Sequence, residues 1–225
     1  MKSNRLLSIT IIVLAVVVCV FKAIDSYLML RYIGAVKLYR DGLVHSYYSK
    51  WQNLAEGVVP FGGLLHLSLY TLLILWTYRV YFNIHRLDNY QPENSLNWSV
   101  IGWIFPALNF IYPYRIISES YLEYQNQIEF DAYRTKNPIL IWWILFMFSY
   151  ALIPVIITFL GGNAAVANPT NGILIQLRFQ ILGNIGATIS MVFLARYIWN
   201  MMQLEPQFMT LAPRKAMPIE DHLIQ

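Results

Sequence analysis

The stretch that decides the fold class is Leu6–Phe21, LLSITIIVLAVVVCVF, which contains no charged residue. Lys2 and Arg5 precede it, as in a secretory signal peptide. The run nevertheless exceeds the usual apolar core of about 7–15 residues, and no Ala-x-Ala-like cleavage site follows it. Bulky valines precede Cys19, which argues against lipoprotein cleavage. The sequence therefore predicts an uncleaved anchor helix.

The whole chain shares this apolar character. Of its 225 residues, 57% are hydrophobic and 12% are charged, whereas a soluble domain carries about 25% charged residues. Lipid is the solvent in which such a surface is stable. The net charge of +4 suits loops that face anionic lipid, and it argues against nucleic acid as a partner. A single cysteine allows neither an internal disulfide nor a cysteine metal site.

Four stretches reach the roughly 20 apolar residues that a membrane-spanning helix needs. They are Leu6–Leu30, Val58–Tyr78, Pro138–Leu160 and Ile173–Leu204. We expect residues 31–57 to lie along the membrane surface and residues 161–172 to form a charge-free external loop. Lys22 and Asp25, three residues apart near the end of the first stretch, are expected to pair and reach the lipid headgroups.

A shorter apolar stretch, Val100–Pro113, lies between the second and third of these segments. At 1.5 Å per residue it extends roughly 21 Å, less than the hydrocarbon core of about 30 Å. It also contains Pro106 and Asn109. The sequence favours a re-entrant or interfacial element here and leaves a five-span alternative open. The expected fold class is thus an all-α integral membrane protein with four transmembrane helices and this Pro-broken third segment.

Residues 114–134 are expected to form an amphipathic helix on the inner membrane face, with Ile117, Tyr121 and Tyr124 on its apolar side. Its acidic side would face water or a protein partner. The positive-inside tendency places the C-terminus in the cytoplasm. The predicted organisation is an N-terminal anchor helix with an amphipathic surface segment (1–57), a helical membrane core (58–204) and a mobile cytoplasmic tail (205–225).

Two groups of polar residues are candidate sites. The first is an intramembrane polar face, interpreted mainly as a packing surface with a substrate path left open. It comprises His66, Gln176, Gln180, Asn184 and Thr188. The second surrounds the third segment and is interpreted mainly as a folding lock, with a small-molecule or headgroup site left open. It comprises Arg79, Asn83, Trp103, Pro106, Asn109, Pro113, Tyr114 and Glu119. We expect Arg79 and Glu119 to form an ion pair that holds this segment.

The second group carries a family resemblance. Trp76, Arg79 and Asn83 are followed by the sequence Gly-Trp-x-x-Pro-x-x-Asn, which begins at Gly102, and by Pro-Tyr and Glu119. This pattern resembles the bacterial family catalogued as domain of unknown function 4328 (DUF4328), over residues 58–205. The resemblance implies a multi-pass protein of the bacterial cytoplasmic membrane and implies no activity.

The common catalytic signatures are missing from the sequence, including His-Glu-x-x-His, Gly-x-Ser-x-Gly, the phosphate loop and the dinucleotide fingerprint. We therefore expect no catalytic residues, metal or cofactor, although a membrane enzyme is left open. The favoured function is a non-catalytic accessory or scaffold subunit of a larger membrane assembly. Its partners would be membrane lipids and either other membrane proteins or further copies of the chain. The alternative is a small transporter, a channel or a sensor that binds a lipid or ligand.

Overall fold

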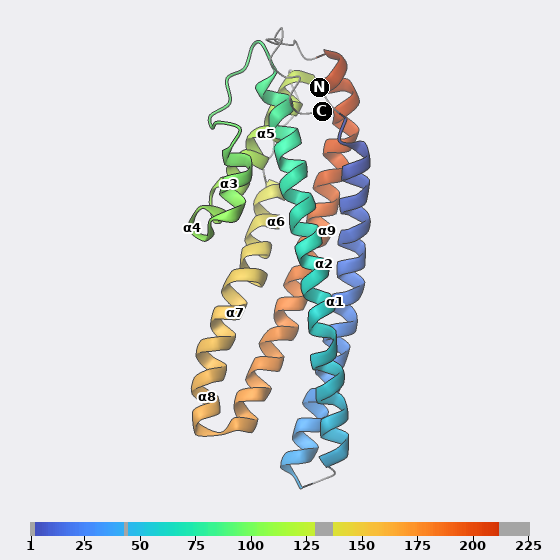
Figure 1. Ribbon diagram of the computed structural model, residues 1–225, viewed down its shortest axis with the longest axis vertical. Coiled ribbons are helices and arrows are strands. Elements are labelled where there is room, and N and C mark those ends of the chain that lie inside the picture. Colours follow the sequence, from blue (N-terminus) through green and yellow to red (C-terminus); the bar gives the residue numbers. More distant parts are fainter. Residues whose placement is uncertain (1–2, 43–44, 129–136, 212–225) are drawn as a thin grey trace. The chain divides into compact units, whose positions relative to one another are not determined.

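The structure is a computed structural model that describes residues 3–42, 45–128 and 137–211. Within these ranges most of the chain is helical, and no strand is present (Figure 1). The helices are α1 (Arg5–Arg40), α2 (His45–His85), α3 (Trp98–Ile104), α4 (Pro106–Asn109), α5 (Tyr112–Ile128), α6 (Asn137–Met147), α7 (Ile153–Ile156), α8 (Gly162–Ala167) and α9 (Pro169–Leu211). Two π-helical turns, η1 (Phe148–Leu152) and η2 (Ile157–Gly161), connect α6, α7 and α8.

Four helical stretches are long and apolar enough to cross a membrane: α1, α2, Ile139–Val166 and α9. They suggest a membrane protein and confirm the four apolar segments predicted from the sequence. The helices are longer than expected. Residues 31–57 were predicted as a surface segment, but residues 31–40 complete α1 and residues 45–57 open α2.

The expected re-entrant segment is a broken helix. Trp98–Ile104 and Ala107–Ile128 are bent by 115° relative to each other, so the described chain would reach five spans only if this bent pair counted as one. The extended backbone of Phe105 breaks the helix, and Pro106 begins the next turn. A proline is favourable in a first helical turn because its missing N–H is not needed there.

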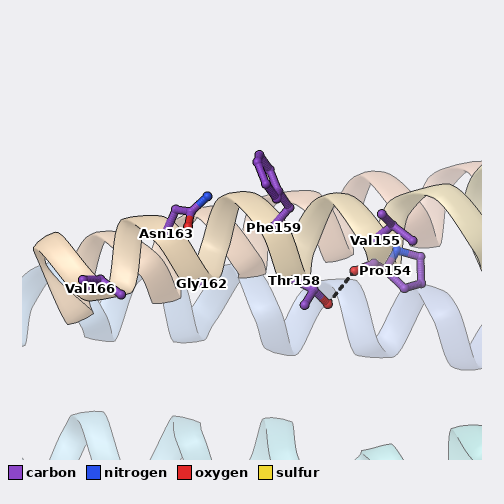
Figure 2. A pocket seen from close by; sticks show the side chains of 7 residues that line it. All are labelled: Pro154, Val155, Thr158, Phe159, Gly162, Asn163 and Val166. Atoms are coloured by element: carbon purple, nitrogen blue, oxygen red, sulfur yellow. Dashed lines mark hydrogen bonds between the residues drawn. The ribbon is translucent and has the colours of Figure 1, made fainter.

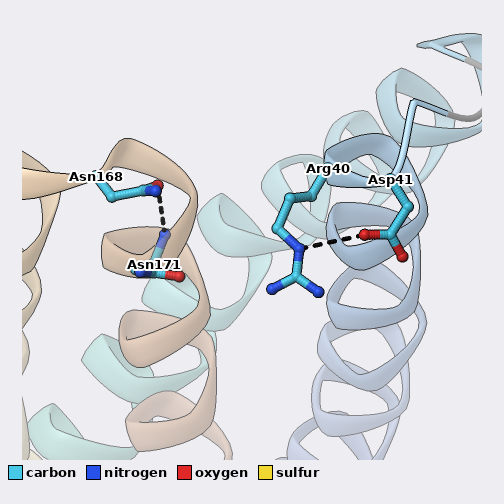
Figure 3. Close-up of polar contacts among 4 residues, drawn as sticks. All are labelled: Arg40, Asp41, Asn168 and Asn171. Atoms are coloured by element: carbon cyan, nitrogen blue, oxygen red, sulfur yellow. Dashed lines mark hydrogen bonds and ion pairs between the residues drawn. The ribbon is translucent and has the colours of Figure 1, made fainter.

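The charge-free loop predicted for residues 161–172 is almost entirely helical. Only Asn168, with an extended backbone, separates α8 from α9. Its side-chain oxygen accepts hydrogen bonds from the backbone N–H groups of Thr170 (3.0 Å) and Asn171 (3.3 Å), as an N-cap residue does. Figure 3 shows the bond to Asn171. The same figure shows Arg40 at the end of α1, where its Nε lies 3.3 Å from Asp41 Oδ1.

The chain divides into two compact units built from interleaved segments. Unit 1 comprises residues 1–10, 72–137 and 197–225, and unit 2 comprises residues 11–71 and 138–196. In contrast, each of the three parts predicted from the sequence (1–57, 58–204 and 205–225) is one continuous segment. Each of the helices α1, α2 and α9 has one portion in unit 1 and the other portion in unit 2.

In unit 2, small residues allow the helices to approach closely. A Cβ atom on Gly62 would lie 2.7 Å from the Phe21 ring, and a Cβ atom on Gly186 would lie 2.5 Å from Ser149 Oγ. Close approach at small residues is the usual way in which helices associate in lipid. An apolar core at one end of the unit contains Met29, Tyr32, Val36, Ala55, Leu174 and Leu177.

In unit 1, α5 is buried on more sides than an amphipathic surface helix. Glu119 and Glu123, expected to face water or a partner, are 8% and 4% exposed. The broken segment packs tightly against the start of α5. Trp98 stacks on Tyr112 with 4.4 Å between ring centroids, and a Cβ atom on Gly102 would meet Tyr112 Cβ at 2.6 Å. The acidic side of α5 is therefore interior because the preceding loop and neighbouring helices cover it.

Candidate functional site

The first candidate site is a polar cluster inside unit 2, between helices that are otherwise apolar. Asp25 of α1 is 5% exposed and Asn184 of α9 is 3% exposed. The Asn184 amide donates hydrogen bonds to Asp25 Oδ2 (2.8 Å) and Ser26 Oγ (3.2 Å). Thr188 donates to the Asn184 carbonyl at 2.8 Å. The carboxyl group is therefore held inside the unit, and the prediction that it reaches the lipid headgroups is wrong.

His66 of α2 forms the second part of this cluster. Its Nδ1 lies 2.6 Å from the Gly62 carbonyl oxygen, and its Nε2 lies 2.7 Å from the Tyr150 hydroxyl. The two rings meet edge to face, with 5.2 Å between centroids. Lys22 and Asp25 are close enough to act electrostatically on the imidazole. Both ring nitrogens thus have a partner, in an environment that contains one cation and one carboxyl group.

The local sequence explains how Tyr150 reaches this position. Pro154 follows four residues later, and a proline inside a helix removes one backbone hydrogen bond and clashes with the carbonyl four residues earlier. The helix accommodates Pro154 by forming the π-helical turn η1, which contains Tyr150. Such turns often occur at functional sites.

The predicted polar face of α9 is only partly assembled here. Asn184 and Thr188 join the cluster. Gln176 instead packs against Gly161, because a Cβ atom added to Gly161 would lie 2.5 Å from the Cγ atom of Gln176. Gln180 is half-buried. Asp25 and Tyr150 were missing from the predicted site. An isolated carboxyl group next to an apolar run could have identified Asp25 from the sequence, but no sequence feature identified Tyr150.

The second candidate site is centred on Glu119 in unit 1. One carboxylate oxygen accepts hydrogen bonds from the Tyr90 hydroxyl (2.8 Å) and the Glu93 backbone N–H (2.7 Å). The other lies 2.9 Å from the Tyr81 hydroxyl. Burial, together with the hydrogen bond to Glu119 and its negative charge, raises the pKa of the Tyr90 phenol well above its ordinary value. The phenol therefore stays neutral and continues to donate at physiological pH.

The predicted Arg79–Glu119 ion pair is wrong. No ion pair joins them within the described ranges, and the carboxylate is occupied by the partners above. Arg79 is exposed, whereas Tyr81 is buried. Two residues along an α-helix are separated by about 200° of rotation, so the side of α2 that meets Glu119 is opposite to Arg79.

The other predicted members of this cluster serve packing. The Asn83 amide donates to the Tyr124 hydroxyl at 3.3 Å, and Tyr124 stacks on Phe208 with 3.8 Å between centroids. Trp103 is buried. The remaining members lie along the broken helix: Pro106 begins α4, Asn109 ends it, and Pro113 and Tyr114 lie in the first turn of α5.

A shallow groove of about 600 Å³ runs along the outer face of α7, η2 and α8. Figure 2 shows its lining, which is mostly apolar and comes from a single helical stretch. The only hydrogen bond drawn runs from the Thr158 hydroxyl to the Pro154 carbonyl, at 2.9 Å. This surface has the character of a lipid-facing helix side. Within the described residues, no group of three or more His, Cys, Asp or Glu side chains could hold a metal ion.

Comparison with known proteins identifies a family. The family model described as Domain of unknown function (DUF4328) matches residues 43–203. No curated protein and no solved structure matches the chain. The matched region includes both parts of the broken helix, Glu119, His66 and Asn184, whereas Lys22 and Asp25 lie before it.

Proposed function

The chain belongs to the DUF4328 family, and from this premise we propose that it is a multi-pass protein of the bacterial cytoplasmic membrane that acts as a non-catalytic accessory or scaffold subunit. Support for the membrane comes from the four apolar helices. An even number of spans agrees with the contact between Asn4 and Glu205, in which the Asn4 backbone N–H donates to Glu205 Oε1 at 2.6 Å. In this topology both ends of the chain are cytoplasmic.

For a chain with four spans, the charge distribution favours the same orientation. With four spans and an inner N-terminus, ten of the sixteen Lys and Arg residues belong to the inner side, in agreement with the positive-inside tendency. They are Lys2, Arg5, Arg79, Arg86, Arg115, Arg134, Lys136, Arg196, Arg214 and Lys215.

We propose further that the broken helix of unit 1 is re-entrant. Its bend of 115° turns the chain back, and the tip exposes the large apolar side chains of Ile104, Phe105, Phe110 and Ile111. Irregular backbone at membrane depth must be satisfied by protein. Here the short helices α3 and α4 supply most of the backbone partners, with additional bonds such as Asn109 N–H to the Phe105 carbonyl at 2.9 Å.

The scaffold role rests on one observation: the family pattern separates into inward and outward residues. Asn83, Trp103 and Glu119 are buried, and Asn83 and Glu119 form hydrogen bonds inside unit 1. Arg79, from the same pattern, is exposed. A guanidinium presents a planar set of donors that fits a carboxylate or phosphate group. The inward residues thus build a rigid element, and Arg79 is left available to a partner's anionic group.

A tagged pull-down of the full chain in mild detergent tests this role. We expect a stoichiometric membrane-protein partner that is retained at high salt and reduced by Arg79→Gln. The matched control is Arg5→Gln, which removes another exposed arginine of unit 1 and should leave recovery unchanged. A protein that migrates alone, or one for which both variants behave alike, would contradict the proposal.

A small transporter or sensor is the second candidate, and the buried cluster in unit 2 favours it. Ionisable groups at membrane depth are costly and usually mark a functional path. Asp25 and His66 are such groups. If the protein is a transporter or sensor, His66→Gln abolishes transport or sensing while the protein still inserts and folds.

A further inference from the structure

We propose that unit 2 contains an intramembrane proton-binding site, in which Nε2 of His66 takes the proton. The inference goes beyond the scaffold role and rests only on the proposed membrane placement of unit 2. It is carried by the hydrogen-bond geometry around His66 and by the charged groups that face it.

The first argument is the tautomer of the imidazole. A carbonyl oxygen can only accept, so the 2.6 Å contact with Gly62 requires the proton on Nδ1. In the neutral ring Nε2 is then the acceptor, and the Tyr150 hydroxyl donates to it across 2.7 Å. The one vacant protonation position of the ring is therefore defined by the fold.

The second argument is the versatility of Tyr150. A hydroxyl can donate or accept. When Nε2 takes a proton, the Tyr150 hydrogen rotates away and its oxygen accepts the new N–H, while the heavy atoms keep their positions. Gly62 continues to accept from Nδ1. Both protonation states of His66 are thus fully hydrogen-bonded without any movement of the helices.

The third argument is electrostatic. Among the described residues, the titratable groups that act on this pair are Cys19, Lys22 and Asp25 of α1. Helix α9 meets these α1 residues through the neutral Asn184 and Thr188. The Asn184 amide stabilises an ionised Asp25. The carboxylate then favours an imidazolium on His66, and the Lys22 ammonium opposes it. These two charges therefore shift the proton affinity of the site in opposite directions.

The test follows His66 by NMR in the full chain, with isotope-labelled histidine, in nanodiscs of phosphatidylethanolamine and phosphatidylglycerol. His66→Gln assigns the signal. We expect a titration between about pH 4 and 9, which Lys22→Gln moves to at least about tenfold higher proton affinity and Asp25→Asn to at least about tenfold lower affinity. Asp41→Asn, at an exposed carboxyl group outside the cluster, should have no effect.

Two results would overturn the proposal. One is a His66 signal that does not titrate in this range either in the unchanged protein or in Lys22→Gln, the variant that favours the imidazolium. The other is a titration that Lys22→Gln does not move, since this variant retains Asp25 and its bond to Asn184. Neither result bears on the membrane placement of unit 2, which cysteine labelling along the unit 2 portions of α1, α2 and α9 tests separately.

Discussion

Asn184 donates a 2.8 Å hydrogen bond to the Asp25 carboxyl group across 159 positions of sequence, and both side chains are almost completely buried. This bond joins α1 to α9 inside unit 2. A buried carboxylate without a donor loses the solvation that water would provide. The Asn184 amide replaces that solvation, so this bond favours the packing of α1 against α9.

Replacing Asn184 should therefore destabilise unit 2. We expect Asn184→Leu to lower the free energy of unfolding by about 1–3 kcal/mol, the usual effect of leaving a buried polar group unpaired. Adding Asp25→Leu should recover part of this loss. Reversible unfolding in mixed micelles measures both effects. Gln180→Leu, at a half-buried position one turn away, is the control and should change stability by less than about 0.5 kcal/mol.

Glycine substitutions should distinguish close helix contacts from open positions. A Cβ atom on Gly172 would lie 2.7 Å from Ala165 Cα and 2.8 Å from Ala165 N, which are backbone atoms that cannot rotate away. Gly172→Ala should therefore destabilise the α8–α9 turn. Gly63 has nothing within 4 Å, so Gly63→Ala should stabilise α2 by about 0.5–1 kcal/mol. Thermal denaturation in detergent compares them, and equal effects would contradict the packing.

Tyr90 should make unit 1 sensitive to alkali. Its pKa is raised in the folded state, so its contribution to stability is complete below the unfolded value of about 10 and is lost as pH rises above it. Tyr90→Phe cannot ionise and cannot donate to Glu119. It should lower stability at neutral pH and flatten the decline above about pH 10. Unfolding measured against pH checks this, and an unchanged alkaline slope would refute it.

The tip of the broken helix should be shielded in membranes. In a Cys19→Ser background, Phe110→Cys should react poorly with a membrane-impermeant maleimide in vesicles open on either face, and should react fully after solubilisation. Gln91→Cys, at an exposed loop position, should react in vesicles that present the cytoplasmic face. Equal reactivity of the two positions before solubilisation would exclude a re-entrant tip.

The sequence alone determined the features that depend on local composition. An apolar stretch of about 20 residues predicts a spanning helix whatever surrounds it, so the four long helices were predicted correctly. Their ends were placed less well, because polar residues within 31–40 continue α1 past its apolar stretch and those within 45–57 begin α2 before its apolar stretch. The proline in the third segment was likewise enough to predict a break.

Only the tertiary structure decided which polar residues meet. Whether Glu119 faces Arg79 or Tyr81 depends on the rotation of α2 about its axis, and that rotation follows from packing along the whole helix. Asp25 meets Asn184 because the packing of α1 against α9 in unit 2 brings both side chains to the same level. Partners separated by 159 positions leave no local pattern, since each side chain alone is compatible with several neighbours and burial selects one of them.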